Sequence, residues 1–199
     1  MNLLRAAATI SGLTLVSRIL GLVRETLVAS VYGAGALTDA FFVAFRLPNM
    51  LRRLFAEGAF TQAFVPVLAQ SQQHSPEETR RVLDAVATML FWVLTAVVAV
   101  GVLAAPWLVW MVASGLRQDP QTFSIAVLMT RWMFPYILLI SLVALAAAVL
   151  NLWKRFAVPA FAPVLLNISI ILAALFLSPY FDPPVLALAA GVMIGGVLQ

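Results

Sequence analysis

The chain has 199 residues, of which 63% are hydrophobic and only 10% charged, and its mean hydropathy is +1.03. Soluble domains are nearer half apolar and a quarter charged, so this composition predicts an integral membrane protein. The apolar runs are long and do not alternate with polar residues, which favours transmembrane helices over a β-barrel. We therefore expect an all-α, polytopic helix bundle.

Charge and residue usage exclude several other classes. The net charge of +4 comes almost entirely from arginine, and no basic cluster lies on a soluble module, so nucleic-acid binding is not expected. There is no cysteine, and the single histidine, His74, lies in a polar stretch. We therefore expect no disulfide, no metal site and no cofactor.

The apolar runs predict about six membrane helices, the last of them incomplete. Their expected ranges are 3–32, 37–68, 82–113, 123–150, 158–177 and 185–199. Arg18, Arg24 and Glu25 interrupt the first run, so we expect a retained helix and not a cleaved signal peptide. The last run is roughly fifteen residues long, short of the roughly twenty that cross a bilayer. We expect a piece of a longer protein.

The segments between the helices predict the orientation. Hydrophilic loops or turns are expected over 70–81, 114–121, 151–156 and 178–184, and Pro48 is expected to kink or unwind the second helix. If the N-terminus is cytoplasmic, the inner segments hold most of the loop basic residues, namely Arg5, Arg80, Arg81, Lys154 and Arg155. The outer loops then hold only Arg117. This distribution follows the positive-inside rule and predicts a cytoplasmic N-terminus.

The first two helices carry an unusual set of charges for membrane spans. The cations are Arg18, Arg24, Arg46, Arg52 and Arg53, and the anions are Glu25, Asp39 and Glu57. Each charge near the centre of a span costs about 2.5–3.5 kcal/mol on insertion scales, so such residues usually face a bundle interior or a watery cavity. Arginine suits phosphate because its planar fork donates two parallel hydrogen bonds. We therefore hypothesise a cavity for an anionic, phosphorylated substrate.

The alternative is a structural role, in salt bridges between helices or at the headgroups. For Arg46, Arg53 and Arg131 that reading is at least as good. For Arg18, Arg24 and Arg52 we favour the cavity. Asp39, Arg46, Arg53 and Glu57 fall close to one helical face, with Arg52 on the neighbouring one.

Signals for an enzyme are weak. The serines have no nearby His–Asp partners, the carboxylates have no metal-ligand spacing, and no glycine-rich phosphate loop follows a strand. We expect no catalytic residues and a transporter.

Four stretches resemble one known family. They are SRILGLVRE, TDAFFVAFRLPNMLRRLFAEGAFTQAFVPVLA, FPYILLISL and NLWKRFAVPAFAPVLLNIS, which begin at Ser17, Thr38, Phe134 and Asn151. They resemble the MurJ (MviN) family, bacterial lipid II flippases of the MOP exporter superfamily. The resemblance runs essentially end to end, and the long charged motif of the second helix is its most specific part.

The resemblance implies a function that composition alone does not. Members translocate the undecaprenyl-pyrophosphate-linked peptidoglycan precursor from the cytoplasmic to the periplasmic leaflet of the bacterial inner membrane, for cell-wall synthesis. They use two helical lobes around a cationic cavity, and this chain resembles the N-terminal one. The implied partners are lipid II, membrane lipids and the second lobe.

The resemblance also implies roles for particular residues. Those implied to bind substrate are Arg18, Arg24 and Arg52, of which Arg24 and Arg52 would contact the pyrophosphate. Those implied to support the cavity or its gating are Ser17, Glu25, Asp39, Arg53 and Glu57. Many relatives carry Asp where this chain has Glu25, which keeps the charge and lengthens the reach.

The predicted function is therefore a lipid II flippase lobe that works by alternating access. The alternatives are another exporter of the same superfamily, moving a lipid-linked oligosaccharide or a small organic cation, a membrane enzyme acting on a polyprenyl phosphate, and a non-transporting scaffold of the cell-wall machinery. The excess of arginine argues against a cationic substrate.

Overall fold

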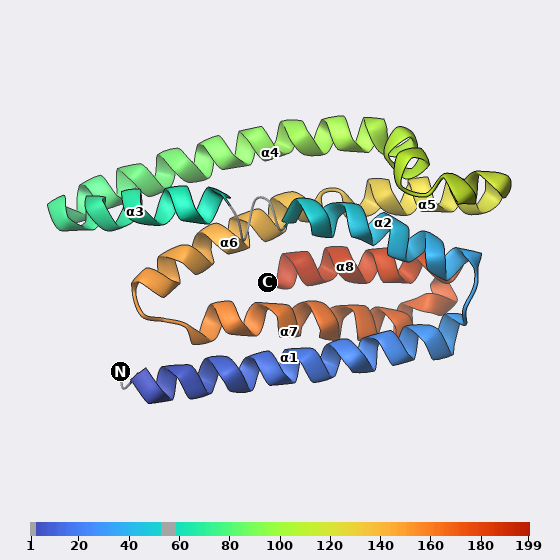
Figure 1. The fold of residues 1–199 in the computed structure, drawn as a ribbon, viewed down its shortest axis with the longest axis horizontal. Coiled ribbons are helices and arrows are strands. Elements are labelled where there is room, and N and C mark those ends of the chain that lie inside the picture. Colours follow the sequence, from blue (N-terminus) through green and yellow to red (C-terminus); the bar gives the residue numbers. More distant parts are fainter. Residues whose placement is uncertain (1–2, 53–58) are drawn as a thin grey trace.

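A computed structural model describes residues 3–52 and 59–199, with side chains placed for 7–50, 62–116 and 118–199. Within these residues the fold is helical and contains no strand (Figure 1). The α-helices are α1 (Leu3–Tyr32), α2 (Ala36–Arg52), α3 (Ala59–His74), α4 (Pro76–Val112), α5 (Pro120–Met133), α6 (Tyr136–Leu152), α7 (Ala157–Leu172) and α8 (Leu186–Leu198). Short helical segments η2 (Ser114–Gln118), η3 (Ala173–Leu177) and η4 (Ser178–Tyr180) connect them. The expected all-α fold is confirmed.

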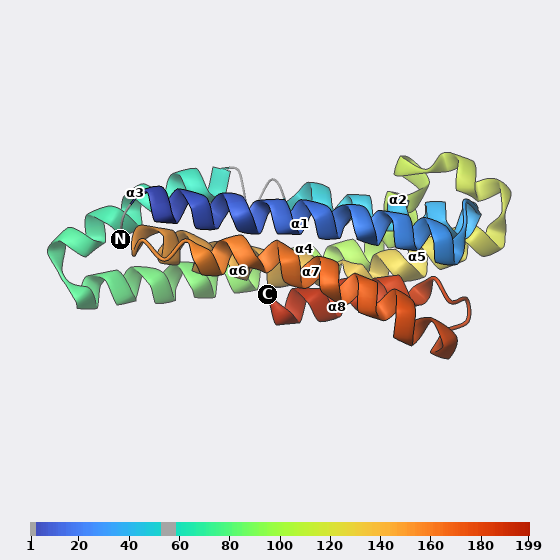
Figure 2. The same ribbon diagram turned by 90° about the horizontal axis from the view of Figure 1, so that it is seen from below.

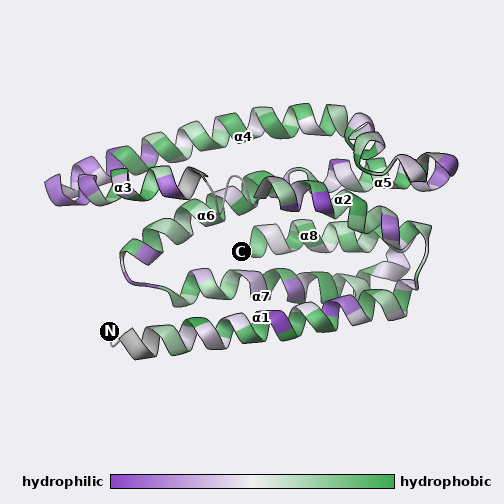
Figure 3. Cartoon of the chain, viewed as in Figure 1, coloured by the Kyte–Doolittle hydropathy of each residue, from purple (hydrophilic) through white to green (hydrophobic). Residues whose placement is uncertain are grey.

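Four helical stretches are long and apolar enough to cross a membrane. They are Ala7–Tyr32, Pro76–Val112, Pro120–Leu152 and Ala157–Tyr180, and Leu186–Leu198 is a shorter apolar helix. Hydrophobic positions dominate α4, α6, α7 and α8, whereas the α3–α4 and α6–α7 turns are hydrophilic (Figure 3). These stretches are those of a multi-pass membrane protein.

The helices run roughly parallel to the long axis of the molecule, so the connections gather at its two ends (Figure 1). The N-terminus lies at the same end as the α3–α4 and α6–α7 turns. The α1–α2, α4–α5 and α7–α8 connections lie at the opposite end. α1 packs along α7, and the two helices lie side by side in both views (Figures 1 and 2).

The outer face of α4 is a strip of exposed apolar side chains. Met89, Trp92, Leu103, Trp107 and Met111 are each between 65% and 79% exposed. From Met89 to Met111 the helix rises about 33 Å, which matches a hydrocarbon core of about 30 Å. This strip has the length and composition of a lipid-facing surface.

One expected helix is described in part, and another is divided in the structure. The second, expected over 37–68, is described as α2 and α3, and residues 53–58 between them lie outside the described part of the chain. Pro48 does not unwind α2, which continues through it to Arg52. The fourth, expected over 123–150, is interrupted at Phe134 and Pro135, where α5 ends and α6 begins. Proline lacks the N–H that would continue the helical ladder, which explains this interruption.

The hydrophilic loop expected over 70–81 is helical instead. Only Ser75 separates α3 from α4, and its Oγ accepts a 3.1 Å hydrogen bond from the backbone N–H of Glu78. Pro76 occupies the first turn of α4, where its missing N–H is not needed. Glu77 and Glu78 lie in the same turn, where their negative charges interact favourably with the positive end of the helix dipole. The polar sequence is therefore a capped helix start, and α4 begins six residues before the expected Val82.

Candidate functional site

Arg24 lies in the C-terminal half of α1, on the face that packs against α7. Its Nη1 donates a 3.0 Å hydrogen bond to Oδ1 of Asn167. Its Nη2 lies 3.1 Å from Oε1 of the neighbouring Glu25. The Arg24 side chain is 20% exposed and that of Glu25 is 61% exposed. A cation is therefore held at a helix–helix seam, with one neutral and one anionic partner.

Asn167 of α7 also contacts Ser17 of α1, which lies seven residues before Arg24. Nδ2 of Asn167 donates to the backbone carbonyl of Ser17 at 3.0 Å and approaches the Ser17 hydroxyl at 3.5 Å. Ser17 and Arg24 are seven residues apart, close to two helical turns, so they share one face of α1. Gly21 lies between them on this face, and a Cβ there would make an ordinary van der Waals contact with the amide, 3.9 Å from Nδ2.

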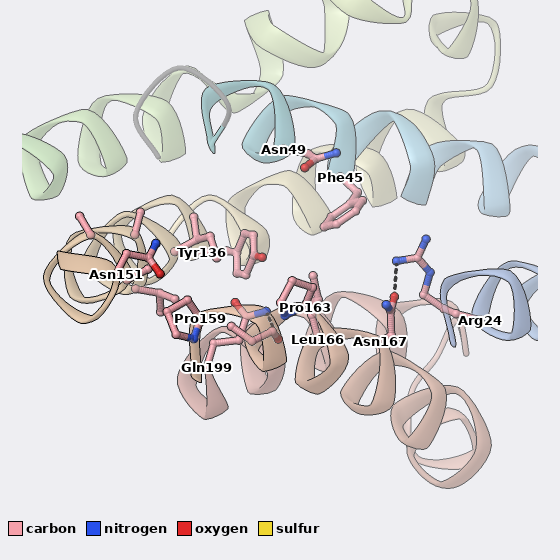
Figure 4. A pocket seen from close by; sticks show the side chains of 16 residues that line it. Arg24, Phe45, Asn49, Tyr136, Asn151, Pro159, Pro163, Leu166, Asn167 and Gln199 are labelled. Carbon is pink, nitrogen blue, oxygen red and sulfur yellow. Dashed lines mark hydrogen bonds between the residues drawn. The ribbon is translucent and has the colours of Figure 1, made fainter. Parts of the chain in front are cut away.

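A cavity of about 600 Å³ opens beside Arg24 (Figure 4). It is lined by α1, α2, α6 and α7 and by the residue after α8. Its lining residues are Arg24, Phe45, Asn49, Tyr136, Ile140, Val143, Ala144, Ala147, Ala148, Asn151, Pro159, Ala162, Pro163, Leu166, Asn167 and Gln199. Most of the wall is apolar, whereas Arg24 brings a charge and the asparagines bring carboxamides. Its volume falls in the range of small-molecule sites, about 300–1,000 Å³.

A second cavity of about 470 Å³ continues along the α1–α7 seam. It shares Asn151, Pro159 and Pro163 with the first cavity and adds Ser17 of α1. Ser17 and Arg24 thus border neighbouring cavities, and Asn167 connects them.

The other residues singled out from the sequence are placed differently. Arg18 is exposed on another face of α1, and Asp39 is exposed in the first turn of α2. Neither side chain makes an ion pair or hydrogen bond within the described part of the chain. Arg52 is the last residue of α2, and its side chain lies outside the described residues, as do Arg53 and Glu57. The structure therefore brings together Ser17, Arg24 and Glu25 of the expected set.

Asn167 is the site residue that the sequence did not single out. The available signal was a carboxamide inside the otherwise apolar helix α7, which is a position where a polar group needs a partner. Its partners are about 150 residues away in the chain, so the sequence could not name them. No group of three or more His, Asp or Glu side chains close enough to hold a metal ion occurs among the residues that the structure describes.

A multi-pass helical bundle with a cation at the edge of a cavity defines the class of polytopic helical membrane proteins that hold an ionisable residue inside the bundle. The model of the family described as "Lipid II flippase MurJ" matches residues 28–199. The chain belongs to this family, which confirms the resemblance of its charged helical motif.

Relatives and a solved structure agree with this assignment. The chain is 56% identical over 200 residues to the lipid II flippase MurJ of Burkholderia cenocepacia, covering 100% of this chain and 39% of the relative. It is 43% identical over 208 residues to the probable lipid II flippase MurJ of Vibrio cholerae, again covering 39% of the relative. A solved structure, "Lipid II flippase MurJ, inward closed conformation", superposes with a TM-score of 0.77 at 29% identity, covering 94% of this chain and 40% of that one. The chain thus spans about two fifths of the length of these relatives.

Proposed function

We propose that this chain is one lobe of a lipid II flippase and that its Arg24 contacts the pyrophosphate of the lipid-linked precursor. The single observation that carries the proposal is the Arg24 guanidinium at the edge of a cavity of about 600 Å³, held by Asn167 and Glu25. The names of the relatives, lipid II flippases of Burkholderia and other bacteria, support the choice of substrate.

The chemistry of Arg24 suits a pyrophosphate. A guanidinium has five N–H donors in a rigid fork, and the hydrogen bonds to Asn167 and Glu25 occupy one donor on each terminal nitrogen. The remaining donors can bind two phosphate oxygens in the bidentate geometry that arginine favours. The Glu25 carboxylate is more exposed than Arg24 and can turn toward water when an anion replaces it.

The polar and aromatic groups of the cavity wall suit the head of the substrate. Asn49 and Asn151 offer carboxamides that can hydrogen-bond sugar hydroxyls or peptide amides, and Phe45 and Tyr136 offer ring surfaces. In this proposal the polar head crosses through the cavity while the polyprenyl tail stays in lipid. A transporter, and not an enzyme, is proposed.

The proposed site includes further residues of both helices. Arg52 follows Asn49 by three residues and Phe45 by seven, so its register on α2 is that of two cavity-lining positions. Arg18 and Arg52 remain proposed substrate ligands, and Asp39, Arg53 and Glu57 remain proposed supporting residues. The rest of the substrate pathway would come from a second lobe of the complete protein.

We also propose that the N-terminus is cytoplasmic and that the membrane is the bacterial inner membrane. Arg80, Arg81, Lys154 and Arg155 lie at or beside the α3–α4 and α6–α7 turns, at the end of the bundle that holds the N-terminus (Figure 1). The positive-inside rule places such an end in the cytoplasm.

The test is translocation by the complete protein carrying Arg24→Ala or Arg24→Lys. Lipid II reaching the outer leaflet is measured by its accessibility to an impermeant reagent in proteoliposomes. We expect Arg24→Ala to lower the initial rate by about tenfold or more, the loss expected for a hydrogen-bonded charge, and Arg24→Lys to recover only part of it. Arg80→Ala, which removes an exposed arginine remote from the cavity, is the matched control. Unchanged translocation by Arg24→Ala would contradict the proposal.

A further inference from the structure

We propose that Asn167 is a positioning residue, which aims the Arg24 guanidinium into the cavity without neutralising its charge. This inference rests on the proposed function, because it concerns how the same site attracts an anionic substrate. It is carried by the three hydrogen bonds that Asn167 makes to α1, at 3.0, 3.0 and 3.5 Å.

The orientation of the Asn167 amide follows from the chemistry of its neighbours. The Ser17 backbone carbonyl can only accept a hydrogen bond, and the Arg24 guanidinium can only donate one. Nδ2 must therefore face Ser17 and Oδ1 must face Arg24, since the flipped amide would place donor against donor and acceptor against acceptor. The carboxamide fits this pair of neighbours in one orientation only.

Asn167 is the partner that directs Arg24 across the seam. Asn167 is 7% exposed and so has few alternative positions. Glu25 is adjacent to Arg24 in sequence, is largely exposed, and leaves α1 about 100° further round the helix. Figure 4 shows the Arg24–Asn167 hydrogen bond at the border of the cavity. Without Asn167, the exposed Glu25 carboxylate would be the one partner left to the guanidinium among the residues that the structure describes.

The neutrality of Asn167 matters as much as its geometry. Arg24 and Glu25 together carry no net charge, so a second carboxylate beside Arg24 would make the group an anion. Like charges repel strongly where water is scarce, so an anionic substrate would bind less well. Asn167→Asp keeps the size and shape of the side chain, adds a negative charge and removes the Nδ2 donor to the Ser17 carbonyl. Asn167→Leu removes the hydrogen bonds without adding charge, so comparing the two variants separates the electrostatic role from the loss of hydrogen bonds.

The experiment measures initial translocation rates of the complete protein in proteoliposomes over a range of lipid II concentrations. The variants are Asn167→Asp and Asn167→Leu, with Arg24→Ala as a reference. Ser169→Ala is the matched control, since Ser169 is also a buried polar residue of α7, but its Oγ has no hydrogen-bond partner in the structure. The thermal unfolding midpoint of each purified variant is measured in parallel.

We expect Asn167→Asp to raise the apparent KM for lipid II by about tenfold or more, with a smaller change in maximal rate. Asn167→Leu should also raise the KM, because Oδ1 no longer orients the guanidinium, and Ser169→Ala should leave the KM unchanged. A purely structural Asn167 would instead lower the unfolding midpoint in the Asp and Leu variants and leave the KM alone.

The outcomes distinguish this inference from the proposed function. If Arg24→Ala slows translocation but Asn167→Asp keeps the parental KM, the role of Asn167 is wrong and that of Arg24 stands. If Arg24→Ala has no effect, the proposed function itself fails. Should Asn167→Leu fail to fold, the isosteric Asn167→Asp variant still decides.

Discussion

Nε of Arg131, in the last turn of α5, donates a 3.3 Å hydrogen bond to the backbone carbonyl of Val102 on α4. The helical partner of that carbonyl would be the N–H of residue 106, which is Pro106 and has none. An unsatisfied carbonyl inside a bilayer is costly. Arg131 therefore stabilises α4 at its proline, which is a structural role for a membrane arginine.

The hydrogen bond between Arg131 and Val102 predicts that substitutions at Arg131 and Pro106 have coupled effects on stability. Arg131→Ala should lower the free energy of unfolding by about 1 kcal/mol, the typical net value of one hydrogen bond. In a Pro106→Ala background the loss should shrink, because the restored backbone N–H then satisfies Val102. Unfolding midpoints of the four proteins in one detergent measure the coupling. Equal losses in the two backgrounds would show that Arg131 acts in some other way.

Gly101 of α4 is predicted to tolerate no side chain. A Cβ at Gly101 would lie 1.8 Å from the ring of Phe134, which is itself only 2% exposed. We expect Gly101→Ala to destabilise the protein by about 1–3 kcal/mol through overpacking.

Gly12→Ala is the matched control for this change. Nothing lies within 4 Å of a Cβ at Gly12 of α1, so alanine should be neutral or should stabilise the helix by up to about 1 kcal/mol. The same loss of unfolding free energy at both positions would contradict the packing at Phe134.

The stability that the Asp119 carboxylate gives to the start of α5 should fall in acid. Hydrogen bonds from the Thr122 hydroxyl and from the backbone N–H of Gln121 hold the pKa of the Asp119 carboxyl below its ordinary value. Because this pKa is lower in the folded protein, the carboxylate stabilises the fold above its unfolded pKa, near 3.8. That stabilisation is lost as the pH falls through the lower, folded pKa.

Asp119→Asn isolates this contribution, because asparagine also caps helices but carries no titratable group. We expect the unfolding midpoint of the parent to fall more steeply with decreasing pH below about 4 than that of the variant. Parallel pH profiles of the two proteins would show that the Asp119 carboxylate does not contribute to the pH dependence of stability.

The sequence predicted the fold class and the family because both depend on features local to the chain. Apolar runs of membrane length and one long charged motif are visible without any tertiary contact. Hydropathy predicts a loop over 70–81 because it cannot separate a loop from an exposed polar helix. The capping pattern of Ser75, Pro76 and Glu78 was the signal that could have separated them.

The candidate site was less predictable. Helical periodicity alone places Ser17 and Arg24 on one face of α1 and Arg18 on another, and the structure has this arrangement. The cavity and the role of Asn167 depend instead on how α6, α7 and α8 pack against α1 and α2. Contacts between residues so far apart in the chain leave no periodic mark in a single sequence.

The central claim is that the cavity beside Arg24 takes the polar head of lipid II, and photo-crosslinking tests it most directly. A photoreactive amino acid replaces Ala147 of the cavity wall in the complete protein, and a second variant carries it at Leu103, which is 79% exposed on the apolar face of α4. We predict a crosslink to head-labelled lipid II at position 147, well above the level at position 103, that is lost on adding Arg24→Ala. Equal labelling at both positions, or labelling at 147 that Arg24→Ala leaves intact, would contradict the account.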